Sequence, residues 1–305
     1  MAVERPASER PAPAIEVPSE FLFAKLHGRR STLYEGRRLR ELAESTDIAD
    51  LAYRLYPQAN LADQFELELQ IQDACVEELA FLGHYAAGPQ RDLYDALMCR
   101  YVVEDLKVLL RLFQQEGAGP DQARLIHLPS GYSLPVEELA GSANVEQFVS
   151  RIPVGVLRQG AVDALPLYRE SGRKAFLEMG LDRGCWQAVG AALCGLSGED
   201  REECEAPVRC EFDAIRFTAA LRASRVYGFS WEQFEALVPS GWGRLGTETL
   251  RRLFGDPRED YVLRVLSAIA PGSRRHLPAE GEVDIMALED VLWRETARLA
   301  RRRFE

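Results

Sequence analysis

The sequence predicts an all-α fold, and three observations lead to this prediction. Apolar residues recur at helical spacing along most of the chain; Val103, Leu106, Leu110 and Phe113 follow the i, i+3, i+7, i+10 pattern of one helix face. The sequence lacks the alternating runs of β-branched residues from which strands are built. One long helical segment also occurs twice, which is typical of duplicated helical domains.

The duplicated segment ends in arginine in both copies. The first copy spans 100–111 and leads to a Pro-Ser-Gly-Tyr turn at 129–132; the second spans 211–222 and leads to Pro-Ser-Gly-Trp at 239–242. The offset is 111 residues and falls to 110 at the turn. A period this long fits a small repeated domain rather than the unit of a solenoid.

The order of elements follows from this repeat. Residues 1–20 predict a disordered tail, because prolines and glutamates fill it and the apolar core of a signal peptide is missing. The first helical repeat is predicted over 21–134, with a long helix at 65–82. The second is predicted over 135–245, with a long helix at 174–193. Each opens with a short Glu-Leu-Ala-x-Ser helix, at Glu41 and at Glu138, respectively.

A third, partial repeat is predicted over 246–305. It passes a Pro/Gly-rich loop at 271–281 and ends in a helix at 287–304, with no copy of the long Arg-terminated helix. We therefore expect part of the apolar face of this last helix to be uncovered. The side chains concerned are Leu288, Val291, Leu292, Leu299 and Phe304.

Composition excludes some classes of function. The net charge of −11 disfavours nucleic acid as a partner, because its phosphates would be repelled. No apolar stretch approaches the roughly 20 residues that cross a bilayer, so we expect any membrane association to go through partners. The six cysteines are too few for a disulfide-built fold and fit reduced thiols in the cytoplasm.

The sequence contains no motif that predicts catalysis or a cofactor. Residues 241–246 match Gly-x-Gly-x-x-Gly, but a helix rather than a strand is predicted before them, so we interpret them as a turn. The four cysteines between 185 and 210 are spaced too widely for a structural zinc site. We predict no catalytic residue, no cofactor and no metal site.

Three groups of segments carry a resemblance to a known family. The opening 21–33 reads Phe-Leu-Phe-Ala-Lys-Leu-His-Gly-Arg-Arg-Ser-Thr-Leu, the two long segments end at Arg111 and Arg222, and Pro-Ser-Gly-aromatic turns follow them. In order and spacing these resemble the first helix, the repeated aromatic-Asp-x-x-Asn-Leu-x-x-x-Leu-Arg helix and the turns of the C-type stalk protein of V/A-type rotary ATPases. The eukaryotic V-type enzymes use the letter d for the same protein. The resemblance covers 21–305.

The chain departs from the family motif at particular positions. The motif aspartate is kept at Asp213 but is Val102 in the first copy, and the motif asparagines are replaced by Asp105 and Arg216. The family also continues past the last predicted helix into a final pair of helices, so the third repeat is expected to be incomplete.

The resemblance implies a non-catalytic central-stalk subunit. Such a protein forms helical repeats around a pseudo-threefold axis, a funnel-like socket that receives the central shaft and sits on the membrane proteolipid ring. Its partners are then the shaft subunits and the ring, it is cytoplasmic and peripheral to the membrane, and it couples shaft to ring in ATP-driven ion transport or ATP synthesis.

Nine charged residues are candidates for the partner interface, each with a structural alternative. The N-terminal cations can equally be solvated helix charge, Arg111 and Arg222 can complement helix dipoles, and the other three can bridge neighbouring helices. The candidates are Arg29, Arg30, Arg37, Arg38, Asp105, Arg111, Asp213, Arg216 and Arg222. Two other functions stay open: a scaffold derived from this family without a motor role, and an enzyme with an unrecognised pocket between the repeats.

Overall fold

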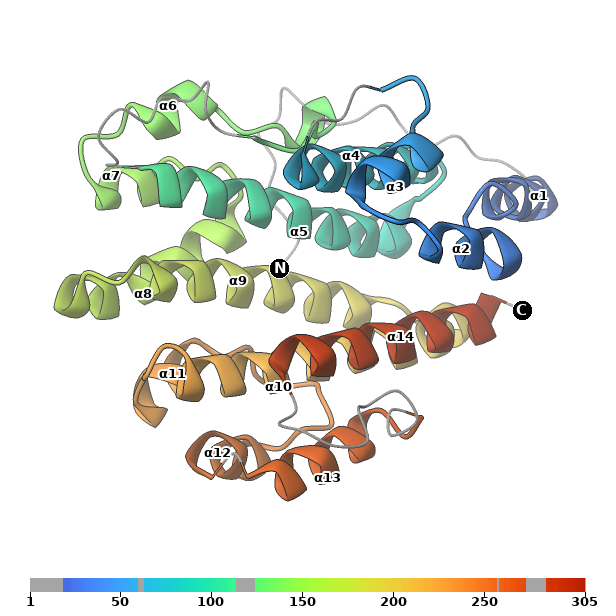
Figure 1. Ribbon diagram of the computed structural model, residues 1–305. Helices are drawn as coiled ribbons and strands as arrows, with labels where there is room; N and C mark the ends of the chain where they lie inside the picture. The colour runs from blue at the N-terminus through green and yellow to red at the C-terminus, as the bar shows by residue number, and fades with distance from the viewer. Residues whose placement is uncertain (1–18, 60–62, 114–123, 257, 273–283, 305) are drawn as a thin grey trace. The chain divides into compact units, whose positions relative to one another are not determined.

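The computed structural model describes residues 19–59, 63–113, 124–256, 258–272 and 284–304. These ranges contain fourteen α-helices, one 3₁₀-helix and no strand, which confirms the predicted all-α fold (Figure 1). Most of the predicted N-terminal tail and of the predicted loop at 271–281 lies outside the described residues.

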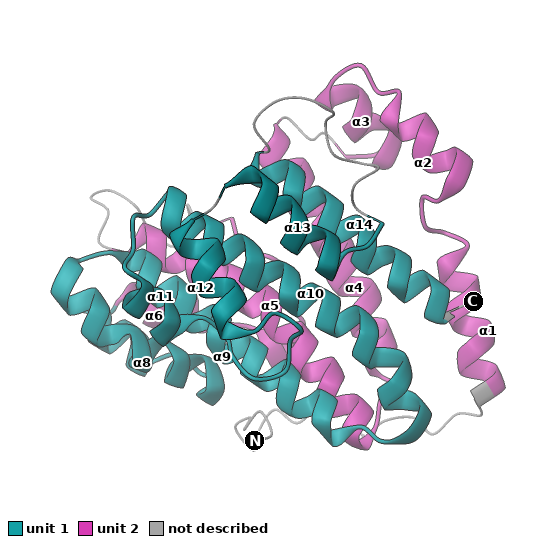
Figure 2. Cartoon of the chain, turned by 90° about the horizontal axis from the view of Figure 1, so that it is seen from below, with its two compact units in different colours: residues 1–4, 142–305 teal, residues 5–141 magenta. Residues whose placement is uncertain are grey.

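The described residues form two compact units that divide after Gly141 (Figure 2). The N-terminal unit contains α1 (Ser19–Arg30), α2 (Gly36–Ala43), α3 (Ile48–Leu55), α4 (Gln64–Gly83), α5 (Gly88–Leu112), η2 (Ser130–Tyr132) and α6 (Val136–Ala140). The C-terminal unit contains α7 (Val145–Ser150), α8 (Gly155–Ser171), α9 (Lys174–Gly195), α10 (Gly198–Arg225), α11 (Trp231–Leu237), α12 (Thr247–Gly255), α13 (Glu259–Ile269) and α14 (Ile285–Phe304).

The predicted helices appear close to their predicted bounds. The helices expected over 65–82, 174–193 and 287–304 are α4, α9 and α14, and the duplicated segments lie in α5 and α10. The apolar stripe of α5 is buried as its spacing indicates, with every member 6% exposed or less. Helical periodicity was sufficient for α5, which carries such a stripe, whereas α9 buries apolar residues on several faces and was predicted from its length and composition.

The two units share local features at matching positions. Both long helices begin at a glycine with positive φ, Gly88 at 52° and Gly198 at 55°, a conformation that residues with a side chain rarely adopt. After each Glu-Leu-Ala-x-Ser segment, a short helix is capped by an Asx side chain, that of Asp47 for α3 and that of Asn144 for α7. The arrangement around an axis and the division into 21–134, 135–245 and 246–305 stay predictions.

The closest helix packing in the C-terminal unit is between α8 and α9. A Cβ atom placed on Gly160 of α8 would lie 2.1 Å from the carbonyl oxygen of Gly180 in α9. A Cβ on Gly180 would lie 2.3 Å from the carbonyl oxygen of Gly160, and one on Gly184 would lie 2.5 Å from that of Val156. The two backbones therefore touch, and only glycine fits at these positions.

The expectation of an uncovered face on the last helix is wrong for three of its residues. Leu288, Val291 and Leu292 are 3% exposed or less, because α14 packs along α10 within the C-terminal unit. Leu299 is half-buried, and the side chain of Phe304 lies outside what the structure describes. The prediction assumed that only later sequence could cover α14, whereas an earlier helix covers it.

No helix in the described ranges is both long enough and apolar enough to cross a membrane.

Candidate functional site

The candidates Asp213 and Arg216 on α10 are buried and hold the backbone of a loop. The carboxylate of Asp213 is fully buried and accepts hydrogen bonds from the backbone N–H groups of Arg244 (2.9 Å) and Leu245 (3.1 Å). Arg216, which is 4% exposed, donates from its guanidinium to the carbonyl oxygen of Leu245 at 2.7 Å. Burial lowers the pKa of Arg216, and the charge of Asp213 opposes that shift. Both backbone polar groups of Leu245 are thus satisfied by α10.

The aromatic residue of the second Pro-Ser-Gly turn docks the same loop. The indole of Trp242 stacks on Phe212 of α10 with 4.1 Å between ring centroids and 20° between planes. Gly243 follows it, and a Cβ there would lie 2.3 Å from Asp213 Oδ1. The Gly-x-Gly-x-x-Gly segment 241–246 is therefore a loop packed against a helix, with α11 and no strand before it.

Asp105, on α5 of the N-terminal unit, also holds a loop. It is 3% exposed and accepts the backbone N–H of Ile126 at 2.9 Å. One residue further along, the backbone N–H of His127 donates to Asp73 of α4 at 2.7 Å, and its ring Nδ1 lies 2.6 Å from the same carboxylate. Two carboxylates from neighbouring helices thus hold two consecutive backbone amides.

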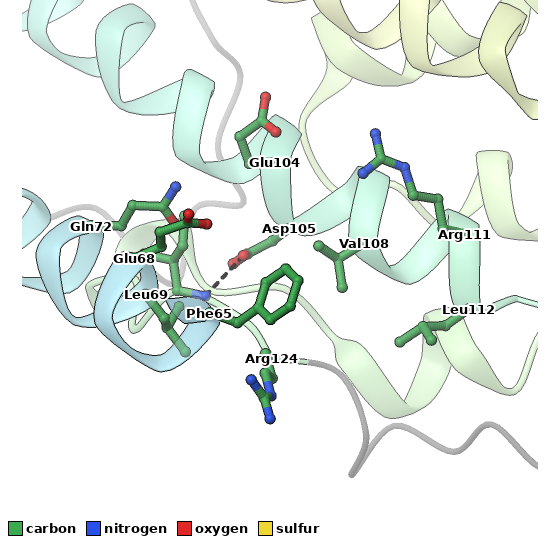
Figure 3. Close-up of a pocket in the computed structure, with 11 residues that line it drawn as sticks. Phe65, Glu68, Leu69, Gln72, Glu104, Asp105, Val108, Arg111, Leu112 and Arg124 are labelled. Carbon is green, nitrogen blue, oxygen red and sulfur yellow. Dashed lines mark hydrogen bonds between the residues drawn. The ribbon is translucent and has the colours of Figure 1, made fainter. Parts of the chain in front are cut away.

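Asp105 also lines a pocket of about 490 Å³ between α4, α5 and the segment that begins at Arg124 (Figure 3). Figure 3 marks the hydrogen bond of the Asp105 carboxylate with a dashed line and shows Phe65 and Val108 beside it; the donor is the backbone N–H of Ile126. Burial raises the pKa of Asp105 to about 7, the charges of Asp73 and Glu104 add to the rise, and the Ile126 N–H opposes it. The remaining lining side chains are Glu68, Leu69, Gln72, Arg111, Leu112, Arg124 and Ile126.

Arg29 and Arg30, at the end of α1, are engaged within the N-terminal unit. The guanidinium of Arg29 pairs with Glu78 of α4 at 2.6 Å and lies over the ring of Phe81, 4.1 Å from its centroid. Nε of Arg30 lies 3.5 Å from a carboxylate oxygen of Glu35, which makes a second ion pair. These cations tie α1 and the turn after it to their neighbours, while their exposed surface stays available to a partner.

Arg37 and Arg38 of α2 lie on a more open surface. The side chain of Arg37 is 87% exposed and pairs with Glu41 one helical turn later at 2.7 Å. The guanidinium of Arg38 lies over the ring of Tyr34, 4.7 Å from its centroid. Leu39 between Arg38 and the next cation is 53% exposed, and α2 has no buried residue. A short helix without buried side chains is weakly held by its own chain.

Arg111 and Arg222 lie in the last turns of α5 and α10, as the sequence predicted. A cation in the last turn stabilises the helix dipole. Arg222 has a second role, because it pairs with Glu289 of α14 at 2.7 Å and so joins the two helices. Arg111 also lines the pocket beside Asp105.

We expect the Arg222–Glu289 pair to contribute little to stability. Its side chains are 45% and 24% exposed, so water screens the attraction. A double-mutant cycle with Arg222→Ala and Glu289→Ala, measured by urea unfolding, should give a coupling energy of about 0.5 kcal/mol. A coupling above about 2 kcal/mol would contradict this expectation and mean that the pair contributes substantially to holding α14 on α10.

Two of the cysteines are disfavoured as nucleophiles by their surroundings. Burial raises the pKa of both Cys204 and Cys210, which disfavours the reactive thiolate. Among the described residues no three His, Cys, Asp or Glu side chains converge as metal ligands would.

Sequence reasoning missed Asp73, His127 and Trp242 as parts of these loop contacts. Asp73 and His127 are 54 residues apart and belong to no motif, so nothing in the sequence joins them. Trp242 had a signal, since the duplicated turn carries an aromatic residue at the same place in each copy. The first copy uses Tyr132, whose hydroxyl donates to Asp95 of α5 at 2.5 Å.

Comparison with protein families gives a match that extends over both units. The family model described as ATP synthase (C/AC39) subunit matches residues 22–305. Comparison with individual curated proteins gives no match.

Proposed function

The chain belongs to the ATP synthase (C/AC39) subunit family of V/A-type rotary ATPases, and we propose that it is the socket of the central stalk. The family is a non-catalytic, structural part of a rotary ATPase complex, so the partners of the chain belong to that complex. In the proposed role the chain receives the shaft subunits and sits on the proteolipid ring. It then couples their rotation in ATP-driven ion transport or ATP synthesis.

One observation carries this proposal: the family match extends over 22–305, through both compact units, rather than over one motif. The fold supports it. In each unit a buried carboxylate on the long helix holds the backbone of a later loop, and α8 and α9 touch through their backbones. Close-packed interiors of this kind resist deformation, which suits a part that transmits torque.

The nine candidate residues divide by burial into two proposed roles. The exposed cations, Arg37 foremost, would contact acidic groups of a partner directly. Asp105, Asp213 and Arg216 are nearly inaccessible, so their effect on an interface would be indirect, through the loops they hold. We place the protein at the cytoplasmic face of the membrane, attached through its partners.

The test is to tag the chain in its native cell, solubilise the membranes gently and identify what co-purifies. The socket role predicts recovery of P-loop ATPase subunits, shaft subunits and proteolipid. Recovery of the chain alone, or with unrelated proteins, would contradict the socket role and favour a scaffold that kept the fold without the motor.

A charge reversal sharpens this test. Arg37→Glu should reduce the recovery of partner subunits several-fold, because it places a negative charge where the proposal expects an acidic partner group. Arg294→Glu is the matched control, since Arg294 is also exposed, helical and paired one turn away, with Asp290. Equal loss in the two variants would point to instability of the helices rather than to an interface at α2.

A further inference from the structure

The segment 124–128 of the N-terminal unit is held on α4 and α5 by groups of both charge signs. Asp105 accepts the N–H of Ile126, and Asp73 accepts both the N–H and the ring N–H of His127. At the start of the segment, Arg124 pairs with Asp63 just before α4, with an N–O distance of 3.1 Å. The segment then leads into η2, which carries the Pro-Ser-Gly turn.

Two of these attachments have their carboxylates out of water. Asp105 is 3% and Asp73 is 8% exposed, whereas the side chain of Asp63 is 43% exposed. The charged and titratable groups around Asp105 and His127 come from all three packed elements. They are Glu68, Asp73 and Glu77 on α4, Glu104 and Arg111 on α5, and Arg124 with His127 on the segment.

We propose that Asp73, Asp105 and His127 form a pH-sensitive latch, which holds the segment 124–128 on α4 and α5 at acidic pH and loosens it as the pH rises. The latch forms one wall of the 490 Å³ pocket, because Asp105 and Ile126 both line it. The position of the segment therefore also sets the shape of the pocket.

The direction follows first from Asp105. Its pKa is about 7 when the segment is docked, because burial disfavours the ionised form, and tends toward the ordinary value of 3.8 when undocking admits water. The docked state therefore binds more protons between these two values. Docking is strongest below about pH 4, weakens as the pH rises toward 7, and changes no further above it.

His127 acts in the same direction in an adjoining pH range. Its hydrogen bond to Asp73 and the charge of that carboxylate raise the pKa of His127 above the ordinary 6.5. The charged pair therefore stabilises docking fully below pH 6.5, and this contribution is lost as the pH rises through the raised pKa. Asp105 and His127 together make the latch tighten on acidification.

The test is amide hydrogen exchange in the segment 124–128 of the full chain at about pH 5.5 and about pH 7.0, corrected for intrinsic chemistry. In the wild type the opening equilibrium should increase at least about tenfold over this range, because each pH unit on the approach to the Asp105 pKa of about 7 changes it by up to a factor of ten. The amide of Asp105→Asn mimics the protonated acid. In this variant we expect the opening equilibrium to increase about threefold or less over the same range, and His127 accounts for that remaining increase.

Asp63→Asn is the matched control, because it removes a carboxylate that holds the same segment but is exposed. The pKa of Asp63 is lowered by the N–H of Glu66 and by Arg124, so it does not titrate in this range. This variant should open more at both pH values and keep the tenfold ratio. Three results would overturn the latch: no change of the wild-type opening equilibrium between the two pH values, a decrease as the pH rises, or the same ratio in Asp105→Asn as in the wild type. If Asp105→Asn does not fold, carboxyl carbon NMR of the wild type decides, since an Asp105 that titrates near its ordinary value of 3.8 also overturns it.

Discussion

Gly160→Ala should lower the free energy of unfolding by about 3 kcal/mol, although alanine favours helices by about 1 kcal/mol over glycine. The new methyl group would lie 2.1 Å from the carbonyl oxygen of Gly180, a backbone atom that no rotamer change can move. The backbones of α8 and α9 must then separate, and the contacts along both helices are lost with them. Urea unfolding followed by circular dichroism measures the change.

Gly195→Ala provides the control for this prediction. Gly195 is the last residue of α9, is exposed, and has no atom within 4 Å of an added Cβ. We expect this variant to be neutral or slightly more stable, because alanine restricts the unfolded chain. Equal stability of the two variants would show that α8 and α9 do not depend on backbone contact.

Asp213→Ala should destabilise the C-terminal unit by about 4 kcal/mol. The substitution leaves the N–H groups of Arg244 and Leu245 without their acceptor; that of Leu245 is buried, and a buried unsatisfied donor costs about 1–3 kcal/mol. It also removes the nearby anion from the buried guanidinium of Arg216. Chemical unfolding measures the loss, and Asp290→Ala, an exposed carboxylate on α14, should cost less than about 0.5 kcal/mol.

A second substitution tests whether Asp213 acts through the loop. Trp242→Ala removes the ring stacked on Phe212 and so releases the same loop from α10. If the loop is the common element, the double variant should be less destabilised than the sum of the single variants, by about 1 kcal/mol or more. Additive losses would mean that Asp213 stabilises α10 independently of the loop.

The helices could be predicted from the sequence because their signal is local. Each apolar stripe, such as that of α5, repeats within one helix and needs no knowledge of distant residues. The loop contacts could not be predicted, because Asp213 meets its partners 31 and 32 residues later and Asp73 meets His127 54 residues later. Contacts between residues so far apart in the sequence leave no periodic pattern from which they could be predicted.

The sequence was sufficient to select the candidate residues but not to predict what each of them contacts. The resemblance to the family motif singled out positions 105 and 216, and in the structure both hold backbone atoms of a loop. The burial of Asp105 and Arg216 could not be predicted from the sequence. Charged side chains are rarely buried, and the motif does not indicate how exposed its residues are. The cover over α14 was mispredicted for a related reason: α10, which lies far earlier in the sequence, supplies it.

The backbone contact between α8 and α9 also bears on elasticity. Side chains between two helices act as a soft layer, because each can change rotamer and let the helices slide; at Gly160, Gly180 and Gly184 that layer is missing. Shear applied to one helix then passes to the other with little give. In a rotary machine, the elastic twist stored between catalytic steps would accumulate in parts other than this helix pair. The pair itself would deform little.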